Sequence, residues 1–140
     1  MQIIETKNAP VPGGHYSQAV IANGMIFVAG LLPLVPNTNG EMPNGIAAQT
    51  KQVFKNLEAI LDAADSALSH LINVQIFIPD MESWGVIDEI YKSILNAHKP
   101  ARTIIPCGHL RNGALIEANA VASVIPQLIH SRGFLAPKPT

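Results

Sequence analysis

An Asn23-Gly24 pair between two short apolar runs constrains the fold of this chain more than any other local feature. Asparagine and glycine tolerate positive φ, so the pair suits both central positions of a type I′ turn, the turn that joins two antiparallel strands. The apolar runs on either side cover residues 19–30. A β-hairpin is therefore predicted, and the fold has to contain antiparallel sheet.

Two further segments carry the apolar periodicity of amphipathic helices. The first covers residues 47–64, where Val53, Leu57 and Ile60 recur at spacings of three and four. The second runs from Trp84 to Ile94, with Asp80 or Ser83 available as N-cap and a proline beyond its end. These two segments are predicted to be the helices of the chain.

Strands are predicted around these helices at residues 71–78, 101–107 and 114–124, with a turn at 108–113 between the last two. Residues 31–45 hold three prolines and two glycines and indicate a loop. With a first strand at the N-terminus, the order is strand, hairpin, helix, strand, helix, strand, strand. This order and the length of 140 residues predict a single α+β domain with both helices on one face of a sheet.

The charge and composition of the chain limit the classes of molecule that it is expected to bind. Hydrophobic residues make up 48% of the chain and charged residues only 14%, too few to solvate a sheet face that no helix covers. A closed oligomer is therefore predicted. A net charge of -1 provides no field that would attract nucleic acid or an anionic membrane.

Cofactor chemistry finds no support in the sequence. Cys107 is the single cysteine, so a disulfide within the chain is excluded, and the five histidines are scattered without a metal-binding spacing. No glycine-rich phosphate loop and no nucleophile elbow is present. The N-terminus resembles no export signal and no apolar run is long enough to span a bilayer, so a cytoplasmic location is expected.

Glu117 stands out in a strand that alternates in polarity. Ala114, Ile116, Ala118, Ala120 and Ala122 share one face of this strand, whereas Glu117 and Asn119 share the other. A carboxylate in such a strand needs a partner or a solvated cleft, because an isolated buried charge is too costly to keep. The alternative is a surface carboxylate on an edge strand.

Three other side chains have two interpretations each. Arg102 suits a planar carboxylate, either of a ligand or of Glu117 in a structural salt bridge. Tyr16 follows Gly13-Gly14 in a loop and either contacts a ligand or caps the hairpin. Cys107 has no basic motif beside it and is interpreted as a small packing residue rather than a nucleophile.

Six ordered motifs resemble those of the RidA (YjgF) family, from about residue 9 to residue 122. Residues 14–19 read GHYSQA, against GPYSQA in the family, and residues 27–33 read FVAGLLP, against FVSGQxP. Residues 49–61 match the helix pattern QTxxVxxNLxxIL, and residues 88–91 read DEIY, against NExY. The last two matches are PAR at residues 100–102 and ALIE at residues 114–117.

The resemblance implies a chorismate-mutase-like fold over residues 1–126, followed by a C-terminal tail at residues 127–140. Similar proteins form homotrimers in which the sheets make an inner barrel and ligand clefts lie between subunits. The implied activity is hydrolysis of reactive enamines and imines, such as 2-aminoacrylate and other 2-imino acids, to a 2-keto acid and ammonia. It requires neither a metal nor an organic cofactor.

The matched positions imply roles for five residues. Arg102 would bind the substrate carboxylate and Glu117 would position or deprotonate the attacking water. Tyr16 would line the cleft, Gly30 would allow close approach of backbone to the ligand, and Ile104 would offer a backbone group at a position often held by cysteine. Cys107 lies three residues later and receives no role.

Four departures from the family pattern bear on the substrate: His15 for proline, Ala29 for serine, Leu31 for glutamine and Asp88 for asparagine. The first three are expected around the cleft, where Ala29 and Leu31 make the wall less polar and His15 adds a titratable group. Three alternatives to 2-imino acid hydrolysis follow from the resemblance: deamination of 3-aminoacrylate, binding of a carboxylate metabolite without turnover, and RNA cleavage. The net charge of -1 disfavours RNA cleavage.

Overall fold

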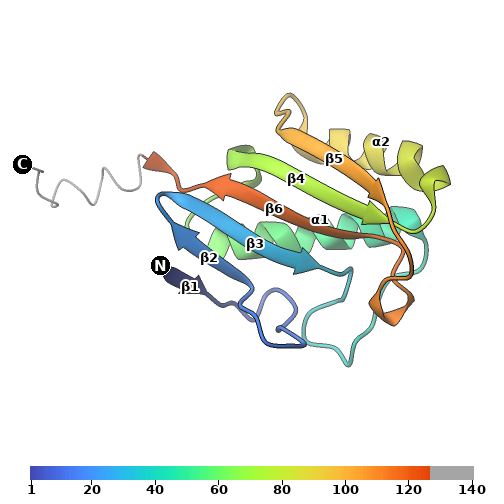
Figure 1. Cartoon of the computed structure of the whole chain (residues 1–140), viewed down its shortest axis with the longest axis horizontal. Helices are drawn as coiled ribbons and strands as arrows, with labels where there is room; N and C mark the ends of the chain where they lie inside the picture. Colours follow the sequence, from blue (N-terminus) through green and yellow to red (C-terminus); the bar gives the residue numbers. More distant parts are fainter. Residues whose placement is uncertain (127–140) are drawn as a thin grey trace, which may run out of the picture.

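The Asn23-Gly24 hairpin forms as predicted, with positive φ of 52° at Asn23 and 74° at Gly24. In the computed structural model, which describes residues 1–126, this hairpin is part of a six-stranded mixed sheet with two α-helices. Figure 1 shows the elements in chain order. Their bounds are β1 Gln2–Ile4, β2 Ala19–Ala22, β3 Met25–Leu31, α1 Ile46–Ala63, β4 Leu71–Ile78, α2 Trp84–Leu95, β5 Ala101–Pro106 and β6 Glu117–Ser123.

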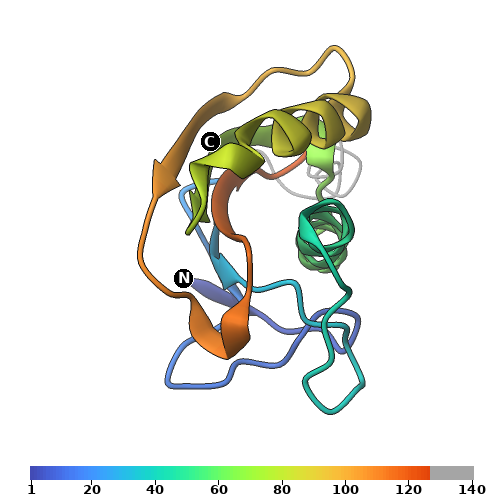
Figure 2. The same ribbon diagram turned by 90° about the vertical axis from the view of Figure 1, so that its right-hand side faces the viewer.

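The strands lie in the order β1-β2-β3-β6-β4-β5. β4 and β5 are parallel and are connected through α2, whereas every other neighbouring pair is antiparallel. β6, the last described strand along the chain, therefore occupies the middle of the sheet between β3 and β4. Both helices lie on the same side of the sheet, as Figure 2 shows end-on, and this confirms the predicted α+β architecture.

The predicted final strand begins too early. Residues 114–116 precede β6, because a 3-10 turn at Arg111–Gly113 redirects the chain through positive φ at Asn112 and Gly113. The Leu115 N–H then donates to Gln49 Oε1 at 2.8 Å instead of to a neighbouring strand. Ala114 and Ile116 are nevertheless buried, so the alternation predicted for their side chains is confirmed.

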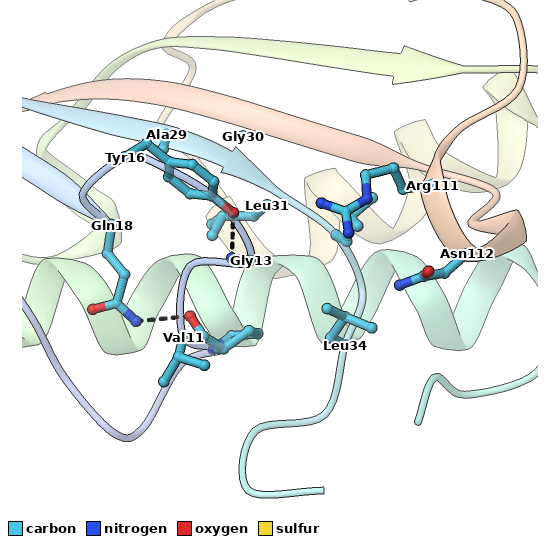
Figure 3. Close-up of a pocket in the computed structure, with 12 residues that line it drawn as sticks. Val11, Gly13, Tyr16, Gln18, Ala29, Gly30, Leu31, Leu34, Arg111 and Asn112 are labelled. Atoms are coloured by element: carbon cyan, nitrogen blue, oxygen red, sulfur yellow. Dashed lines mark hydrogen bonds between the residues drawn. The ribbon is translucent and has the colours of Figure 1, made fainter. Parts of the chain in front are cut away.

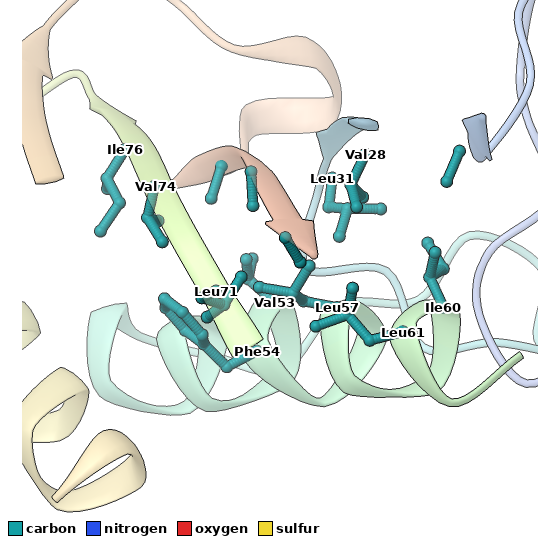
Figure 4. Close-up of a cluster of buried hydrophobic side chains, with 14 of the residues drawn as sticks. Val28, Leu31, Val53, Phe54, Leu57, Ile60, Leu61, Leu71, Val74 and Ile76 are labelled. Atoms are coloured by element: carbon teal, nitrogen blue, oxygen red, sulfur yellow. The ribbon is translucent and has the colours of Figure 1, made fainter. Parts of the chain in front are cut away.

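The core lies between α1 and the helix-facing side of the sheet (Figure 4). α1 contributes its apolar stripe, and the sheet contributes alternate residues of β3, β4 and β6. The small alanines of β6 leave room for the larger α1 side chains. The fully buried members of the stripe are Val53, Phe54, Leu57, Ile60 and Leu61.

The opposite face of the sheet carries no helix among residues 1–126 (Figure 2). Met25 and Phe27 expose 37% and 41% of their surface, and Phe27 pairs in register with Val121 of β6. An apolar face of this kind is what the low charged fraction predicted, and the oligomer that would bury it remains a prediction.

Two buried carboxamides of α1 fix the loops at one end of the sheet. Gln49 accepts from Leu115 N–H and donates to Pro43 O at 3.0 Å, while Asn56 donates to Leu32 O and Leu34 O at 3.2 and 2.9 Å. Buried polar groups of this kind satisfy backbone atoms that no strand or helix pairs. They hold the segments that follow β3 and precede β6.

We expect Gln49→Leu to lower the free energy of unfolding by about 1–3 kcal/mol, because it leaves the Leu115 N–H and the Pro43 carbonyl unpaired. Urea titration measures this loss, and hydrogen exchange at the Leu115 amide should accelerate. Glu58→Leu, on an exposed position of the same helix, is the control and should change stability by less than about 0.5 kcal/mol. Equal stability of the two variants would contradict the clamping role of Gln49.

Candidate active site

The six described strands carry only two charged residues, Arg102 in β5 and Glu117 in β6. Residues paired in register share a face of a sheet. Arg102 pairs with Val74, which is fully buried beneath the helices, whereas Glu117 pairs with Phe77 on the open face. The two charges therefore lie on opposite faces of the sheet.

The predicted alternative of an Arg102–Glu117 salt bridge is wrong for this chain. It assumed that β5 and β6 are neighbours, but β4 lies between them and pairs with both. Arg102 instead forms an ion pair with Asp88 of α2, with 2.8 Å between Nη1 and Oδ1.

The Glu117 carboxylate lies directly against Gly30 of β3. A Cβ at position 30 would overlap Glu117 Oε2, so only glycine leaves room for the carboxylate in this position. The pairing of β3 with β6 shifts register between Val28 and Leu31, and this irregularity includes Gly30. The group that approaches Gly30 in this structure is Glu117, and the close approach of a ligand expected there stays a prediction.

A small cavity of about 80 Å³ opens beside Gly30 (Figure 3). Tyr16 lines it with half of its surface exposed, and its hydroxyl oxygen accepts from Gly13 N–H at 3.2 Å. Ala29 and Leu31 also line this cavity, as expected from the departures, whereas the exposed His15 does not. Tyr16, Gly30 and Glu117 are thereby brought together at one end of β3 and β6.

The Arg102 side chain is held on three sides and is only 20% exposed. Besides its ion pair with Asp88, its guanidinium carbon lies 5.5 Å from the Trp84 ring centroid and 4.7 Å from that of Tyr91. Cation–π contacts and a charge-assisted hydrogen bond therefore fix its orientation. Asp88, the fourth departure, is thus in direct contact with a predicted site residue.

Ile104 and Cys107 lie away from the cavity beside Gly30. Ile104 pairs with Ile76, so its side chain faces the helices and packs against the core. Cys107 follows β5, is half-buried rather than in the core, and donates its N–H to Ile78 O at 3.0 Å. Neither side chain lines the described cavity, and the backbone role expected of Ile104 stays a prediction.

Sequence reasoning missed Arg111, Asn112 and Trp84. Arg111 and Asn112 line the cavity opposite Tyr16, and Trp84 flanks Arg102. The Asn112-Gly113 pair predicts a turn. The direction of the Arg111 side chain, however, depends on the order of the strands in the sheet. The helical spacing of Trp84 only indicated an amphipathic helix.

The Tyr91 hydroxyl is buried and has no hydrogen-bond partner among the described residues. Burial raises the pKa of Tyr91 above its usual value of 10.0, the positive charge of Arg102 lowers it in part, and the negative charge of Asp88 adds to the increase. The neutral phenol is therefore the favoured form in the folded protein.

Comparison with known proteins supports the motifs. The family model for "Endoribonuclease L-PSP" matches residues 6–124. A RutC family protein of Pyrococcus horikoshii is 38% identical over 121 residues, which is 86% of this chain and 96% of the relative. The 2-iminobutanoate/2-iminopropanoate deaminase of Rattus norvegicus is 34% identical over 121 residues, 86% of this chain and 88% of the relative.

A solved structure shares the fold. RidA from an Antarctic Psychrobacter species superimposes with a TM-score of 0.85 and 30% identity, over 89% of this chain and all of the solved one. The one-domain α+β fold of this chain is therefore the fold of this group of small proteins. The chain belongs to the RidA (YjgF) family, some of whose members are named imine deaminases.

Within residues 1–126, no cluster of three or more His, Cys, Asp or Glu side chains is arranged to hold a metal ion. Within the same residues no helix is long and apolar enough to cross a membrane. The tail predicted at residues 127–140 lies outside the described residues.

We expect Tyr91→Phe to raise the free energy of unfolding by about 1 kcal/mol at pH 7, because it removes a buried hydroxyl without a partner. The raised pKa of Tyr91 contributes stability below pH 10, and this contribution disappears as pH rises through the folded-state pKa. The variant should therefore lose less stability between pH 9 and pH 11, measured by urea titration. Tyr16→Phe is the control, and an identical pH dependence in wild type and Tyr91→Phe would contradict the assignment.

Proposed function

We propose that this protein hydrolyses small 2-imino acids to 2-keto acids and ammonia. Its substrates would include 2-iminobutanoate and the imine tautomer of 2-aminoacrylate. The observation that carries the proposal is the Glu117 carboxylate, fixed against Gly30 beside a cavity that Tyr16 also lines. A carboxylate in this position is able to orient a water molecule and to accept a proton from it. The relatives named imine deaminases support the same reaction.

The reaction is an addition of water followed by the loss of ammonia. Water adds to C2 of the protonated imine while Glu117 accepts one water proton, which gives a neutral carbinolamine. Glu117 then returns this proton to nitrogen, the C–N bond breaks, and ammonia leaves while the hydroxyl group gives its proton to Glu117 and becomes the C=O group. An enamine first accepts a proton at C3 to become the imine. Since C2 is already electrophilic, positioning of the substrate and general acid–base catalysis are sufficient.

Arg102 is the proposed anchor for the substrate carboxylate. Within one chain it lies on the face of the sheet opposite Glu117, and β5 is an edge strand. We propose that three copies assemble with their open sheet faces inward, so that Arg102 of one subunit approaches Tyr16, Gly30 and Glu117 of the next. The exposed apolar face at Met25 and Phe27 supports this arrangement, because association would bury it.

RNA cleavage, suggested by the name of the family model, is less well supported. The chain carries nine Lys plus Arg and ten Asp plus Glu, a net charge of -1, which offers no excess of positive charge for a phosphate backbone. A single carboxylate beside a small cavity fits a small substrate better.

We expect Arg102→Ala and Glu117→Gln to abolish imine hydrolysis without unfolding the protein. The test is an assay in which an amino-acid oxidase produces 2-imino acids and semicarbazide competes for them. Wild type should accelerate the loss of imine, and the Arg102 variant should lose at least about a hundredfold in kcat/KM, as for a charged anchor that acts with the catalytic carboxylate.

Size-exclusion chromatography with light scattering is the control for this experiment. Wild type and both variants should give about three times the 15.0 kDa chain mass. Full activity in Arg102→Ala would overturn the anchor. 3-Aminoacrylate is assayed as a further substrate. If neither it nor any 2-imino acid is hydrolysed, the proposed function is refuted and the protein binds a carboxylate ligand without turnover.

Asp88→Asn is expected to tighten substrate binding. Asp88 competes with the ligand carboxylate for the Arg102 guanidinium, and asparagine keeps the shape but removes the charge. KM should fall about three- to tenfold with little change in kcat, since the change affects charge pairing rather than the reacting carbon. Trp84, the only tryptophan, provides an independent fluorescence signal for binding of 2-oxobutanoate.

Glu89→Gln is the matched control for Asp88→Asn. It removes the same charge from the next, exposed position of α2 and should leave KM unchanged. If both variants lower KM equally, the effect is one of net charge and the competition at Arg102 is refuted.

A further inference from the structure

Arg111 places a second guanidinium at the cavity beside Gly30. It begins the 3-10 turn Arg111–Gly113, whose backbone is held by bonds from Gly113 N–H to Leu110 O and from Ala114 N–H to Arg111 O. Its guanidinium lies over Gly13, because a Cβ built on Gly13 would be 3.4 Å from Nη1 and 3.7 Å from Nη2. No carboxylate among the described residues pairs with Arg111, whereas Arg102 is paired with Asp88.

Two other hydrogen-bond donors line this cavity. The Tyr16 hydroxyl oxygen already accepts from Gly13 N–H, so its own proton is available to a ligand. Asn112 contributes a side-chain amide from the same turn as Arg111. Figure 3 shows Arg111 and Tyr16 approaching the cavity from opposite sides.

No carboxylate is among the described residues that line this cavity, and the Glu117 carboxylate lies against Gly30 at its edge. Pro10, Val11, Leu32 and Leu34 are apolar, and the Gln18 side chain is engaged with Thr6 and Pro10. Convergent donors in an otherwise apolar cavity are typical of a site for an anionic group. The volume of about 80 Å³ exceeds the roughly 10–15 Å³ that one water molecule requires, and it suits a carboxylate with one or two methylenes.

We infer that Arg111, with Tyr16 and Asn112, binds a second carboxylate at the end of the substrate side chain. The substrate class is then 2-imino dicarboxylic acids. This inference rests on the proposed function, in which Arg102 of a neighbouring subunit holds the first carboxylate and Glu117 lies against Gly30. A guanidinium binds a carboxylate through two parallel hydrogen bonds, so the side-chain acid is held with a defined orientation.

The test compares two imines that differ in the side-chain acid. Amino-acid oxidases produce 2-iminobutanoate and 2-iminoglutarate, and kcat/KM is measured for each with wild type and Arg111→Gln. The variant should lose about tenfold to a hundredfold in kcat/KM for 2-iminoglutarate, mainly through KM, as expected for a charged hydrogen bond. The value for 2-iminobutanoate should change less than threefold.

Lys51→Gln is the matched control, because it removes one positive charge from an exposed position on α1 outside this cavity. It should leave the ratio of the two kcat/KM values unchanged. The inference would be overturned if Arg111→Gln lowered kcat/KM equally for both imines. It would also be overturned if Lys51→Gln changed the ratio of the two kcat/KM values as much as Arg111→Gln does.

Calorimetric binding of 2-oxoglutarate and 2-oxobutanoate separates this inference from the proposed function. If no imine is hydrolysed but Arg111→Gln weakens 2-oxoglutarate binding tenfold or more, the proposed function fails and the carboxylate site stands. If 2-iminobutanoate is hydrolysed but Arg111→Gln leaves 2-oxoglutarate binding unchanged, the proposed function stands and the inference is refuted.

Discussion

The packing of α1 against the sheet is the interaction on which the rest of this structure depends. Its apolar stripe forms most of the core with β3, β4 and β6, and its two buried carboxamides bind the backbone of the loops that leave β3 and enter β6. The same helix therefore supplies stability and defines the walls of the candidate site. Leu32 and Leu34, whose carbonyl groups Asn56 binds, also line the cavity beside Gly30.

Most elements were predictable because they depend on short-range patterns. The hairpin follows from one Asn-Gly pair, α1 from its three- and four-residue spacing, and β4 from a β-branched run that a proline ends. The predicted final strand started three residues too early, because the Leu115 N–H donates to a buried glutamine on a distant helix and not to a neighbouring strand. Short-range patterns contain no information about such a partner.

For the candidate site, the sequence motifs nominate residues but do not indicate how these residues are arranged. Motifs point to Tyr16, Gly30, Arg102 and Glu117, yet a parallel crossover through α2 inserts β4 between the strands of Arg102 and Glu117. The register of β4 with these two strands places the two charges on opposite faces, a division that spacing along the chain does not indicate. The contact of Asp88 with Arg102 and the direction of Arg111 follow from the same tertiary arrangement.

The central position of β6 also determines the order in which the sheet becomes complete during synthesis. The β1–β3 and β4–β5 portions are separated in the sheet by β6, the last strand in the described part of the chain. Until Glu117–Ser123 leaves the ribosome, β3 and β4 each present an unpaired edge rich in apolar residues. A nascent chain that contains β5 but not yet β6 thus carries two unfinished half-sheets, the stage at which molecular chaperones would have the most surface to protect.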